Sequence, residues 1–449
     1  MREQFDLYLK GIEESERLPP AGIAELQERF AQNLVRFAYE NVPFYRDRLA
    51  RLFVGHGIID LSRWTEIPVI ERVDAVDNGL AMRAGKLPEK YGPVAEFRTS
   101  GTIGTPLTIA VNGTVSTTTN ANIARLMRWF GFDPSRAMAS IKIYPGDERA
   151  LYPHGITAKS WLVGHAAPHY ALHVATPIAQ QLEWLGRVRA PYLVTYPSNA
   201  LALAETISSE EGRALGIEMV IGYAETVPDG TAELVAERFG AKFASHYSCQ
   251  EIGVIAIECP ATGHYHVAIE NAVVELLGEG GRRVEPGERG RVVITGLNNY
   301  AMPFIRYALG DIAVEGTSPC ACGRSLPVIE RIEGRVRNAF TFRDGTRVWP
   351  RGWLAREMWA FVPFRQYQMV QLDHERIEFR YVPDGTGRAA DLSGLNDYAK
   401  RMMHPSAEIS VVAMAVLPRG PSGKFEDFIS LVPVPPAQDE PAGPGATLA

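Results

Sequence analysis

The sequence predicts an α/β protein, with a large N-terminal α/β domain followed by a small C-terminal α+β domain. Short β-branched runs such as PYLVTY, IEMVIGY, AVVELL and GRVVIT have the composition of strands, and helical patterns such as TAELVAERFG lie between several of them. Alternation of this kind over about 300 residues favours largely parallel sheets. After Arg337 the pattern changes to short strands around one helix. We therefore predict one domain over residues 1–337 and a second over residues 338–434.

Two long helices are expected in the N-terminal domain. Apolar residues recur at helical spacing within residues 22–50, until the proline of NVPFY interrupts the pattern. A second helical pattern runs from residue 116 to residue 130, where GFDP stops it. In the small domain the strand-like runs RIEFRYV and EISVVAMAVL flank one helical segment, LSGLNDYAKRMM. Residues 435–449 are rich in proline, alanine and glycine, which predicts a disordered tail.

Composition excludes several classes of partner. A net charge of -6 gives no electrostatic basis for binding nucleic acid or an anionic membrane. The first residues lack the apolar run of a signal peptide, and no stretch approaches the roughly 20 apolar residues that span a bilayer. Four cysteines in 449 residues are no disulfide framework. We therefore expect a cytoplasmic protein without membrane or nucleic-acid partners; a homodimer remains open.

A loop rich in serine, threonine and glycine is the first candidate site. The segment FRTSGTIGTP follows a predicted strand, and such a loop offers backbone N–H groups and hydroxyls to an anion. It does not fit the G-x-x-x-x-G-K-[ST] phosphate-binding pattern. Taken alone, the segment is equally typical of a surface turn.

Three further segments change this interpretation. SHYSCQEIG places Glu251 shortly after Tyr247, MPFIRYALGDIA places Asp311 in a Gly-Asp turn, and LPRGPSGKFEDF places Lys424 in a glycine-rich turn. Each residue has a simpler explanation, as a helix-cap carboxylate, a turn residue or a solvated charge. The order and separation of the four segments together are specific.

These segments resemble those of the adenylate-forming ligases, and among them the phenylacetate–CoA ligase family and its capsule-biosynthesis-type relatives. The resemblance extends to FAYENVPFYRDRL, IPVIERVDA and YPSNALALAE, and so covers nearly the whole chain. It implies a large adenylation domain, with the ATP and acyl sites, and a small mobile domain that carries a catalytic lysine. In the implied reaction, which requires Mg²⁺, ATP and a carboxylic acid give an acyl-adenylate and pyrophosphate. The acyl group then passes to the thiol of coenzyme A, and AMP leaves.

The resemblance also assigns roles to individual residues. The phosphate cradle comprises Thr99, Ser100, Gly101, Thr102 and Gly104, with Thr102 also among the catalytic groups. Ile103 departs from the family pattern, which usually has threonine there. Glu251 would hold Mg²⁺, and Lys424 would neutralise charge at the α-phosphate and carboxylate before leaving with the small domain.

The nucleotide itself would be bound by a second group of residues. Asp311 would accept both ribose hydroxyls, and Tyr247 would flank the adenine. Ala224 and Glu225, in GYAET, match the segment that lines the adenine, although Tyr223 stands where a small residue is usual. Arg335, in EGRVRN, would reach the ribose or phosphate. Arg337 occupies the hinge position, where the family often has aspartate.

The cysteines predict a metal site. Six residues separate Cys259 from His266, and SPCACGR adds Cys320 and Cys322. Three thiolates and an imidazole form a closed tetrahedral set suited to structural Zn²⁺. Spacing alone leaves open ordinary buried thiols, and His264 as the ligand instead of His266; zinc sites in some members of the resembling family favour zinc. Cys249 lies outside this set, and we expect it to be part of the pocket wall.

The function expected is therefore activation of an aromatic acid of the phenylacetate, benzoate, anthranilate or salicylate type, followed by transfer to CoA. The segment from residue 140 to residue 170 falls where relatives line the acyl pocket, and its aromatic and histidine side chains suit a flat, polar-substituted ring. Transfer to a carrier-protein phosphopantetheine or to an amine is the main alternative. A non-catalytic nucleotide-binding descendant and a zinc-stabilised interaction module are further alternatives. The sequence does not identify the acid.

Overall fold

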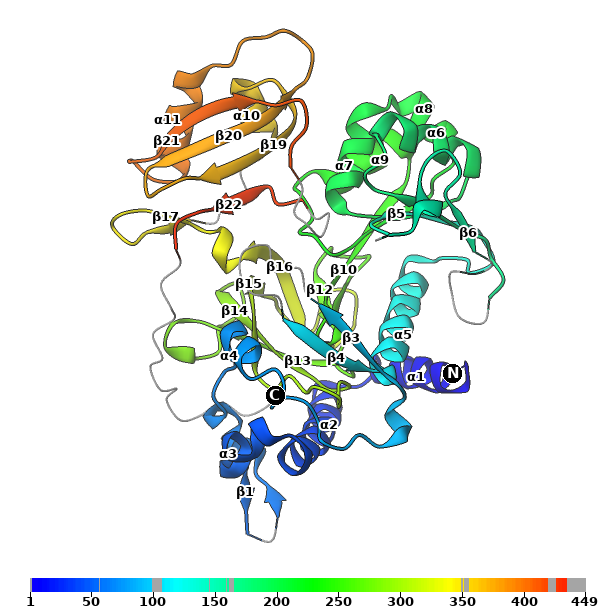
Figure 1. The fold of residues 1–449 in the computed structure, drawn as a ribbon, viewed down its shortest axis with the longest axis vertical. Helices are drawn as coiled ribbons and strands as arrows, with labels where there is room; N and C mark the ends of the chain where they lie inside the picture. The colour runs from blue at the N-terminus through cyan, green and yellow to red at the C-terminus, as the bar shows by residue number, and fades with distance from the viewer. Residues whose placement is uncertain are drawn as a thin grey trace.

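The structure is a computed structural model and describes residues 2–55, 57–98, 107–144, 146–158, 160, 165–348, 350, 355–418 and 425–433. Its centre is a 12-stranded sheet in the order β13-β14-β15-β16-β12-β11-β10-β9-β8-β5-β7-β6. A separate four-stranded sheet, built from C-terminal residues, lies beyond one end of it (Figure 1). The predicted α/β class is confirmed.

The central sheet is parallel in one half and antiparallel in the other. Its strands are β5 (Met138–Lys142), β6 (Ile156–Ala158), β7 (His169–His173), β8 (Tyr192–Thr195), β9 (Met219–Gly222), β10 (Lys242–Cys249), β11 (Gly253–Glu258), β12 (Tyr265–Val267), β13 (Ala272–Leu277), β14 (Arg289–Gly296), β15 (Tyr307–Glu315) and β16 (Val328–Arg335). Strands β10, β9, β8, β5 and β7 pair in parallel. The remaining pairings in this sheet are antiparallel.

The prediction of largely parallel sheets was therefore wrong for AVVELL and GRVVIT. These segments are β13 and β14, which pair antiparallel with Ala272 opposite Gly296 and Leu277 opposite Arg291. The connection between them spans only residues 278–288 and contains a single short 3-10 turn. A parallel pair needs a crossover of a dozen or more residues, usually a helix, so a connection of this kind favours a hairpin.

Both predicted long helices form, but the first is divided into two helices. The helices are α1 (Arg2–Ser15), α2 (Pro20–Asn41), α3 (Arg46–Leu49), α4 (Arg72–Asp77), α5 (Gly113–Phe130), α6 (Ile178–Val188), α7 (Pro197–Thr206), α8 (Ser209–Ala214), α9 (Thr231–Phe239), α10 (Ala355–Phe361) and α11 (Leu392–Met402). The pattern over residues 22–50 becomes α2, a 3-10 turn that begins at Pro43, and α3. Helix α5 ends at Gly131, whose φ of 78° lies in the left-handed region that favours glycine at a helix end. Among the described residues, no helix is both long and apolar enough to cross a bilayer.

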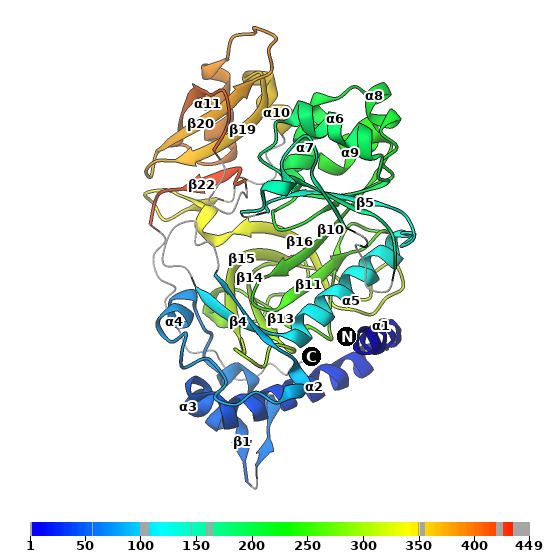
Figure 2. The same cartoon turned by 45° about the vertical axis from the view of Figure 1, so that its right-hand side comes forward.

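Different helices cover the two faces of the parallel half of the sheet. Side chains of α6, α7 and α9 form one core with Ile141 and Leu193 of the sheet. On the opposite face, α5 lies across the strands (Figure 2), and its Phe130 packs with Met138 and Met219. The antiparallel half is covered by the N-terminal helices through a third and larger core.

The C-terminal unit follows β16. It contains the hairpin β17 (Phe340–Thr341) and β18 (Arg347–Val348), and a four-stranded sheet of β19 (Phe364–Gln371), β20 (Arg376–Pro383), β21 (Glu408–Ala413) and β22 (Phe428–Ser430). Its own core joins α10 and α11 to this sheet. Strand β19 lies beside α7 of the large unit in both views (Figures 1 and 2). Residues 435–449, predicted as a disordered tail, lie outside the described residues.

Candidate active site

Three of the predicted nucleotide-binding residues are in contact with one another. Asp311 on β15 lies opposite Arg335 on β16, and Arg335 Nε is 2.9 Å from Asp311 Oδ1. The hydroxyl of Tyr247, on β10, donates to Asp311 Oδ2 at 2.5 Å. Burial and the Asp311 charge raise the pKa of Tyr247, so this hydroxyl remains a donor. A carboxylate offers about four acceptor positions, so Asp311 keeps the capacity to accept further hydrogen bonds.

Glu251 lies in the tight turn between β10 and β11. Its side chain is buried, and its Oε1 accepts a hydrogen bond from the Tyr307 hydroxyl at 3.5 Å. The turn packs closely against α5: a Cβ on Gly253, which has a φ of 85°, would collide with Thr119 of that helix. This close approach holds Glu251 in place. A buried carboxylate provides an oxygen ligand of the kind that Mg²⁺ prefers.

Glu225 joins the two units of the molecule. Its Oε1 accepts a hydrogen bond from the backbone N–H of Phe425 at 2.6 Å, and its Oε2 accepts one from the N–H of Ser198, at the start of α7, at 3.2 Å. Phe425 belongs to the C-terminal unit, where it is buried against Leu417. The preceding residue, Ala224, has a φ of 66°, a backbone conformation rare outside glycine. The sequence did not predict this contact.

Several predicted site residues lie outside the described residues. They are Thr99, Ser100, Gly101, Thr102 and Gly104 of the phosphate loop, and Lys424. The structure nevertheless describes residues that flank both of these segments. Strand β3 (Val94–Arg98) ends before the loop and pairs antiparallel with β4 (Thr108–Asn112) after it, and the anchored Phe425 directly follows Lys424. Arg337 lies in the 3-10 turn Val336–Asn338, directly after β16.

The structure brings together the four predicted zinc ligands. One ligand atom from each of Cys259, His266, Cys320 and Cys322 lies within 4.8 Å of the others. His266 Nε2 is 3.2 Å from Cys322 Sγ. His264, the rival ligand, is not in this group; its carbonyl accepts a hydrogen bond from the Cys259 N–H at 2.7 Å. The donor set and its close spacing fit a tetrahedral zinc site without an open position.

The cysteine and histidine group connects three parts of the large unit. Cys259 follows β11, His266 lies on β12, and the two other cysteines precede β16. Trp129 of α5 lies edge-on to the His266 ring with centroids 5.6 Å apart, and the Arg324 guanidinium lies 4.1 Å from the centre of the Trp129 ring. The group is thus fastened to the helix that also packs against the Glu251 turn.

Cys249 does not have the character of a nucleophile. Burial and the neighbouring Glu251 carboxylate raise the pKa of its thiol well above the usual value. The reactive form of cysteine is the thiolate, which this environment disfavours. The expectation that Cys249 is part of the wall of the site agrees with this.

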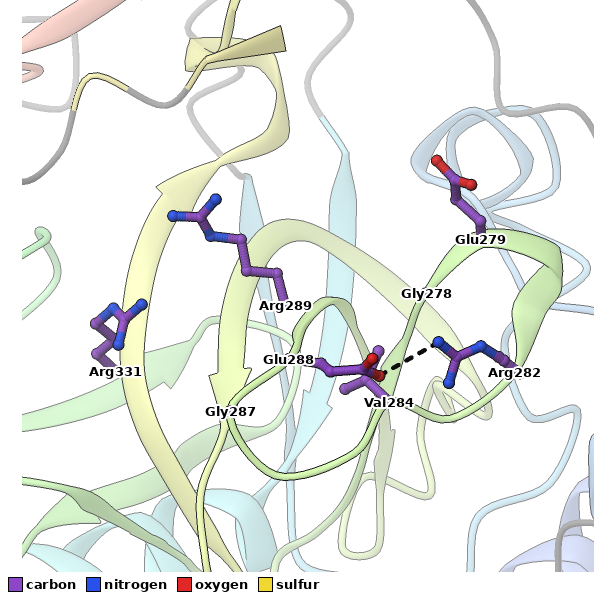
Figure 3. A pocket seen from close by; sticks show the side chains of 8 residues that line it. All are labelled: Gly278, Glu279, Arg282, Val284, Gly287, Glu288, Arg289 and Arg331. Carbon is purple, nitrogen blue, oxygen red and sulfur yellow. Dashed lines mark hydrogen bonds and ion pairs between the residues drawn. The ribbon is translucent and has the colours of Figure 1, made fainter. Parts of the chain in front are cut away.

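A surface hollow of about 570 Å³ lies elsewhere, on the antiparallel half of the sheet (Figure 3). Its charged lining is largely paired: Arg289 and Arg331 both contact the buried Glu333, and Arg282 contacts Glu288. None of the predicted site residues that the structure describes lines this hollow.

The sequence did not single out two residues near the carboxyl ends of the parallel strands: Tyr196, directly after β8, and His246 on β10, one residue past the parallel pairing with β9. Tyr223 stacks between them, with ring centroids 5.2 Å from Tyr196 and 6.5 Å from His246. For Tyr196 the sequence offered a signal in its position, because it ends the predicted strand PYLVTY, and ligands of open α/β sheets bind beyond the carboxyl ends of the strands.

Similarity to known proteins agrees with this geometry. No protein-family model matches the chain. The chain is 26% identical over 356 residues to the phenylacetate–coenzyme A ligase of Thermus thermophilus, an alignment that covers 75% of each protein. Its fold matches 2-hydroxyisobutyryl-CoA ligase in the postadenylation state with a TM-score of 0.70, at 20% identity and over 92% of this chain and 90% of that one.

Two further structural comparisons are informative. The same 2-hydroxyisobutyryl-CoA ligase in the thioesterification state gives a lower TM-score of 0.58. An anthranilate–CoA ligase in complex with anthranoyl-AMP gives a TM-score of 0.53, at 15% identity and over 75% of this chain and 66% of that one. The chain is a homologue of phenylacetate–CoA ligase and has the fold of the adenylate-forming CoA ligases.

Proposed function

We propose that this chain is an AMP-forming acid–CoA ligase that activates an aromatic carboxylic acid. ATP and the acid form an acyl-adenylate and pyrophosphate, and the acyl group then passes to the thiol of CoA as AMP leaves. The observation that carries the proposal is the contact of Asp311 with Tyr247 and Arg335, in a homologue of phenylacetate–CoA ligase. The stacked rings of Tyr223 and His246 favour an aromatic acid.

The contacts support a role for each nucleotide-binding residue. Asp311 accepts the ribose hydroxyls with its remaining acceptor positions, Tyr247 flanks the adenine, and Arg335 reaches the ribose or phosphate. Glu251 would hold Mg²⁺, which when bound would neutralise phosphate charge. Attack of a carboxylate on a polyphosphate brings two anions together, so donors and cations at this point lower the barrier. The loop from Thr99 to Gly104 and the Lys424 ammonium supply these groups.

We propose that Glu225 holds the small domain, residues 338–434, in the orientation for adenylation. The carboxylate binds the N–H of Phe425, one residue after Lys424, and so restrains the chain beside the proposed catalytic lysine. The higher TM-score against the postadenylation state than against the thioesterification state, 0.70 against 0.58, supports this orientation. Release of the Phe425 contact would then accompany domain rotation before thioester formation.

We propose that Cys259, His266, Cys320 and Cys322 hold one structural zinc ion. Four protein ligands leave no position for water, so the ion would not activate a nucleophile. Its effect would be to fasten the loop before β16 to the β11–β12 hairpin, close in sequence to Glu251 and Asp311.

Pyrophosphate release over a panel of aromatic acids, with and without CoA, tests the proposed function. We expect ATP- and acid-dependent release of pyrophosphate, and an acyl-CoA product when CoA is present. Acid-dependent pyrophosphate release without any acyl-CoA would favour transfer to a carrier protein or an amine. The complete absence of ATP turnover with all acids would contradict the proposal.

A further inference from the structure

A row of polar and aromatic side chains ends the parallel half of the central sheet. The strand register aligns Ile141 on β5 with Ser245 on β10, through β8 and β9. Side chains alternate between the faces of a sheet, so Lys142, the last residue of β5, and His246 on β10 lie on the face opposite Ile141. Tyr196 and Tyr223 directly follow β8 and β9, pack with the core under α6, α7 and α9, and form a stack of rings with His246 at this end of the sheet.

The character of this face changes along the strands. Where the strands begin, Met138 and Met219 pack in an apolar core against Phe130 of α5. Where they end, Lys142 and His246 occupy this face, and the rings of Tyr196 and Tyr223 follow the ends of β8 and β9. The change occurs at the end of the sheet where α/β proteins bind their ligands. A row that served only to fill the core under α5 would have remained apolar.

Lys142 is the cation of this row. Its side chain is half-buried, and burial lowers the pKa of its ammonium. Its Nζ lies 5.5 Å from the centre of the Tyr144 ring. No carboxylate of the described part of the chain forms an ion pair with it. A buried charge without a counter-charge is costly, and buried charges in proteins are paired as a rule.

The described side chains around Lys142 hold one another by hydrogen bonds, and none of them forms an ion pair with it. Ser140 Oγ is 2.6 Å from the Tyr144 hydroxyl and 2.7 Å from His169 Nε2, so these three side chains hold one another. Burial and the charge of Lys142 lower the pKa of His169, so its ring is neutral at pH 7. These hydrogen bonds therefore fix the Tyr144 ring next to Lys142. The counter-charge of the Lys142 ammonium would then come from a ligand.

We propose that Lys142 binds an oxygen acceptor on the ring of the aromatic acid, a hydroxyl or a second carboxylate, distinct from the carboxyl group that is adenylated. The inference rests on the proposed function and names its substrate class. The stacked rings beside Lys142 flank the substrate ring, and the substituent oxygen provides the missing partner of the ammonium. An amino substituent, which donates hydrogen bonds, does not satisfy an ammonium group.

The test compares acids that share a ring and differ in one substituent: unsubstituted, hydroxyl, carboxyl and amino forms of benzoate and phenylacetate. The measured quantity is kcat/KM for pyrophosphate release by the full chain. We expect the wild type to prefer the oxygen-bearing acids by about ten- to a hundredfold, as for a charge-assisted hydrogen bond. Lys142→Met should lose this preference yet keep turnover of the unsubstituted acids, and Lys142→Arg should retain part of it.

Lys242→Met is the matched control, because this exposed lysine begins β10 at the other end of the same sheet. It should keep the wild-type preference. A wild type that prefers unsubstituted or amino-substituted acids, or a Lys142→Met variant with unchanged preference, overturns this inference while the ligase function stands. The absence of turnover with every acid contradicts the ligase function instead. Calorimetric binding of the same acids then still tests Lys142, since tighter binding of the oxygen-bearing acids must depend on it.

Discussion

Asp311 is both a structural and a proposed ligand-binding carboxylate. Tyr247 on β10 and Arg335 on β16 already bind its two carboxylate oxygens. These contacts orient the carboxylate before ATP arrives, which reduces the ordering that binding requires. They also mean that a substitution must preserve the shape of the side chain if it is to test binding alone.

Asp311→Asn meets this requirement, because it removes the charge and keeps the size. We expect the KM for ATP to rise by about tenfold or more and the KM for the acid to change less, since hydrogen bonds to a charged acceptor are worth about 1.5–3 kcal/mol each. Steady-state pyrophosphate release with each substrate varied in turn measures both. Tyr247→Phe, which removes one donor to the same carboxylate, serves as a control with a smaller effect. Unchanged ATP affinity in Asp311→Asn would show that Asp311 acts only between the strands.

His246 makes the stability of the protein depend on pH. Burial lowers the pKa of His246 from 6.5 to about 4. Between these pH values the side chain is protonated in the unfolded chain and neutral in the folded protein. Its contribution to stability is complete above pH 6.5 and is lost as the pH falls from 6.5 to 4. The loss amounts to as much as about 3 kcal/mol.

We therefore expect His246→Gln to weaken this dependence: on moving from pH 7.5 to pH 4.5, the free energy of unfolding should fall less in the variant than in the wild type. Denaturant unfolding at the two pH values measures the difference. His154→Gln, at an exposed histidine, should behave as the wild type. Equal pH dependence in the wild type and His246→Gln would mean that His246 is protonated in the folded protein as readily as in the unfolded one.

At the scale of elements, sequence periodicity located helices and strands but not their partners. The patterns that predicted α5, β8 and β9 report local conformation and burial, which neighbouring residues determine. Strand direction depends on how the connection returns, so β13 and β14 were wrongly expected in a parallel sheet. The contact between Glu225 and Phe425 joins residues 200 positions apart and depends on how two units dock. No local pattern contains that information.

The Glu225 contact predicts a selective defect in one half-reaction. Glu225→Gln keeps the shape but weakens acceptance from the Phe425 and Ser198 N–H groups. We expect the rate of acyl-adenylate formation to fall by about ten- to a hundredfold, because a charge-assisted bond is lost in the adenylation orientation alone. Thioester formation from supplied acyl-adenylate should change little, because in the proposed domain rotation the Phe425 contact would already be released.

Single-turnover assays of the two half-reactions measure this separation. Glu211→Gln provides a matched control, because Glu211 caps a surface helix of the same unit through Ser208 and makes no described contact with the small unit. Equal losses in both half-reactions of Glu225→Gln would place Glu225 in the nucleotide site, the role that the sequence predicted for it, rather than at the contact between the units.

At the scale of the whole molecule, the candidate site is assembled from strands in both halves of the sheet. Tyr247 and Asp311 were predicted from motifs because each motif lies within a few residues. The row that contains Lys142 was not, because it exists only through the register of four strands. The cysteine and histidine group lies between these cases: spacing predicted its members, and the fold alone distinguished His266 from His264.

That group gives the last prediction, for which Cys320→Ser is the test. We expect about one tightly bound zinc per wild-type chain, from the closed set of four ligands. Cys320 is buried beside Cys259 and Val328, so the serine leaves a three-ligand site at the junction of β11, β12 and the segment before β16. Binding of a structural metal contributes directly to folding, so the variant should lose zinc and on the order of several kcal/mol of stability. At low temperature it should retain adenylation, because an ion enclosed by four protein ligands would touch no reacting group. Elemental analysis and thermal unfolding measure the two effects, and Cys249→Ser, outside the group, should keep its zinc.

Two outcomes would contradict this prediction. Wild-type protein with less than about a tenth of an equivalent of zinc and freely titratable thiols would show that the cysteines are ordinary. Zinc displaced by substrate would show that the site is open to ligands.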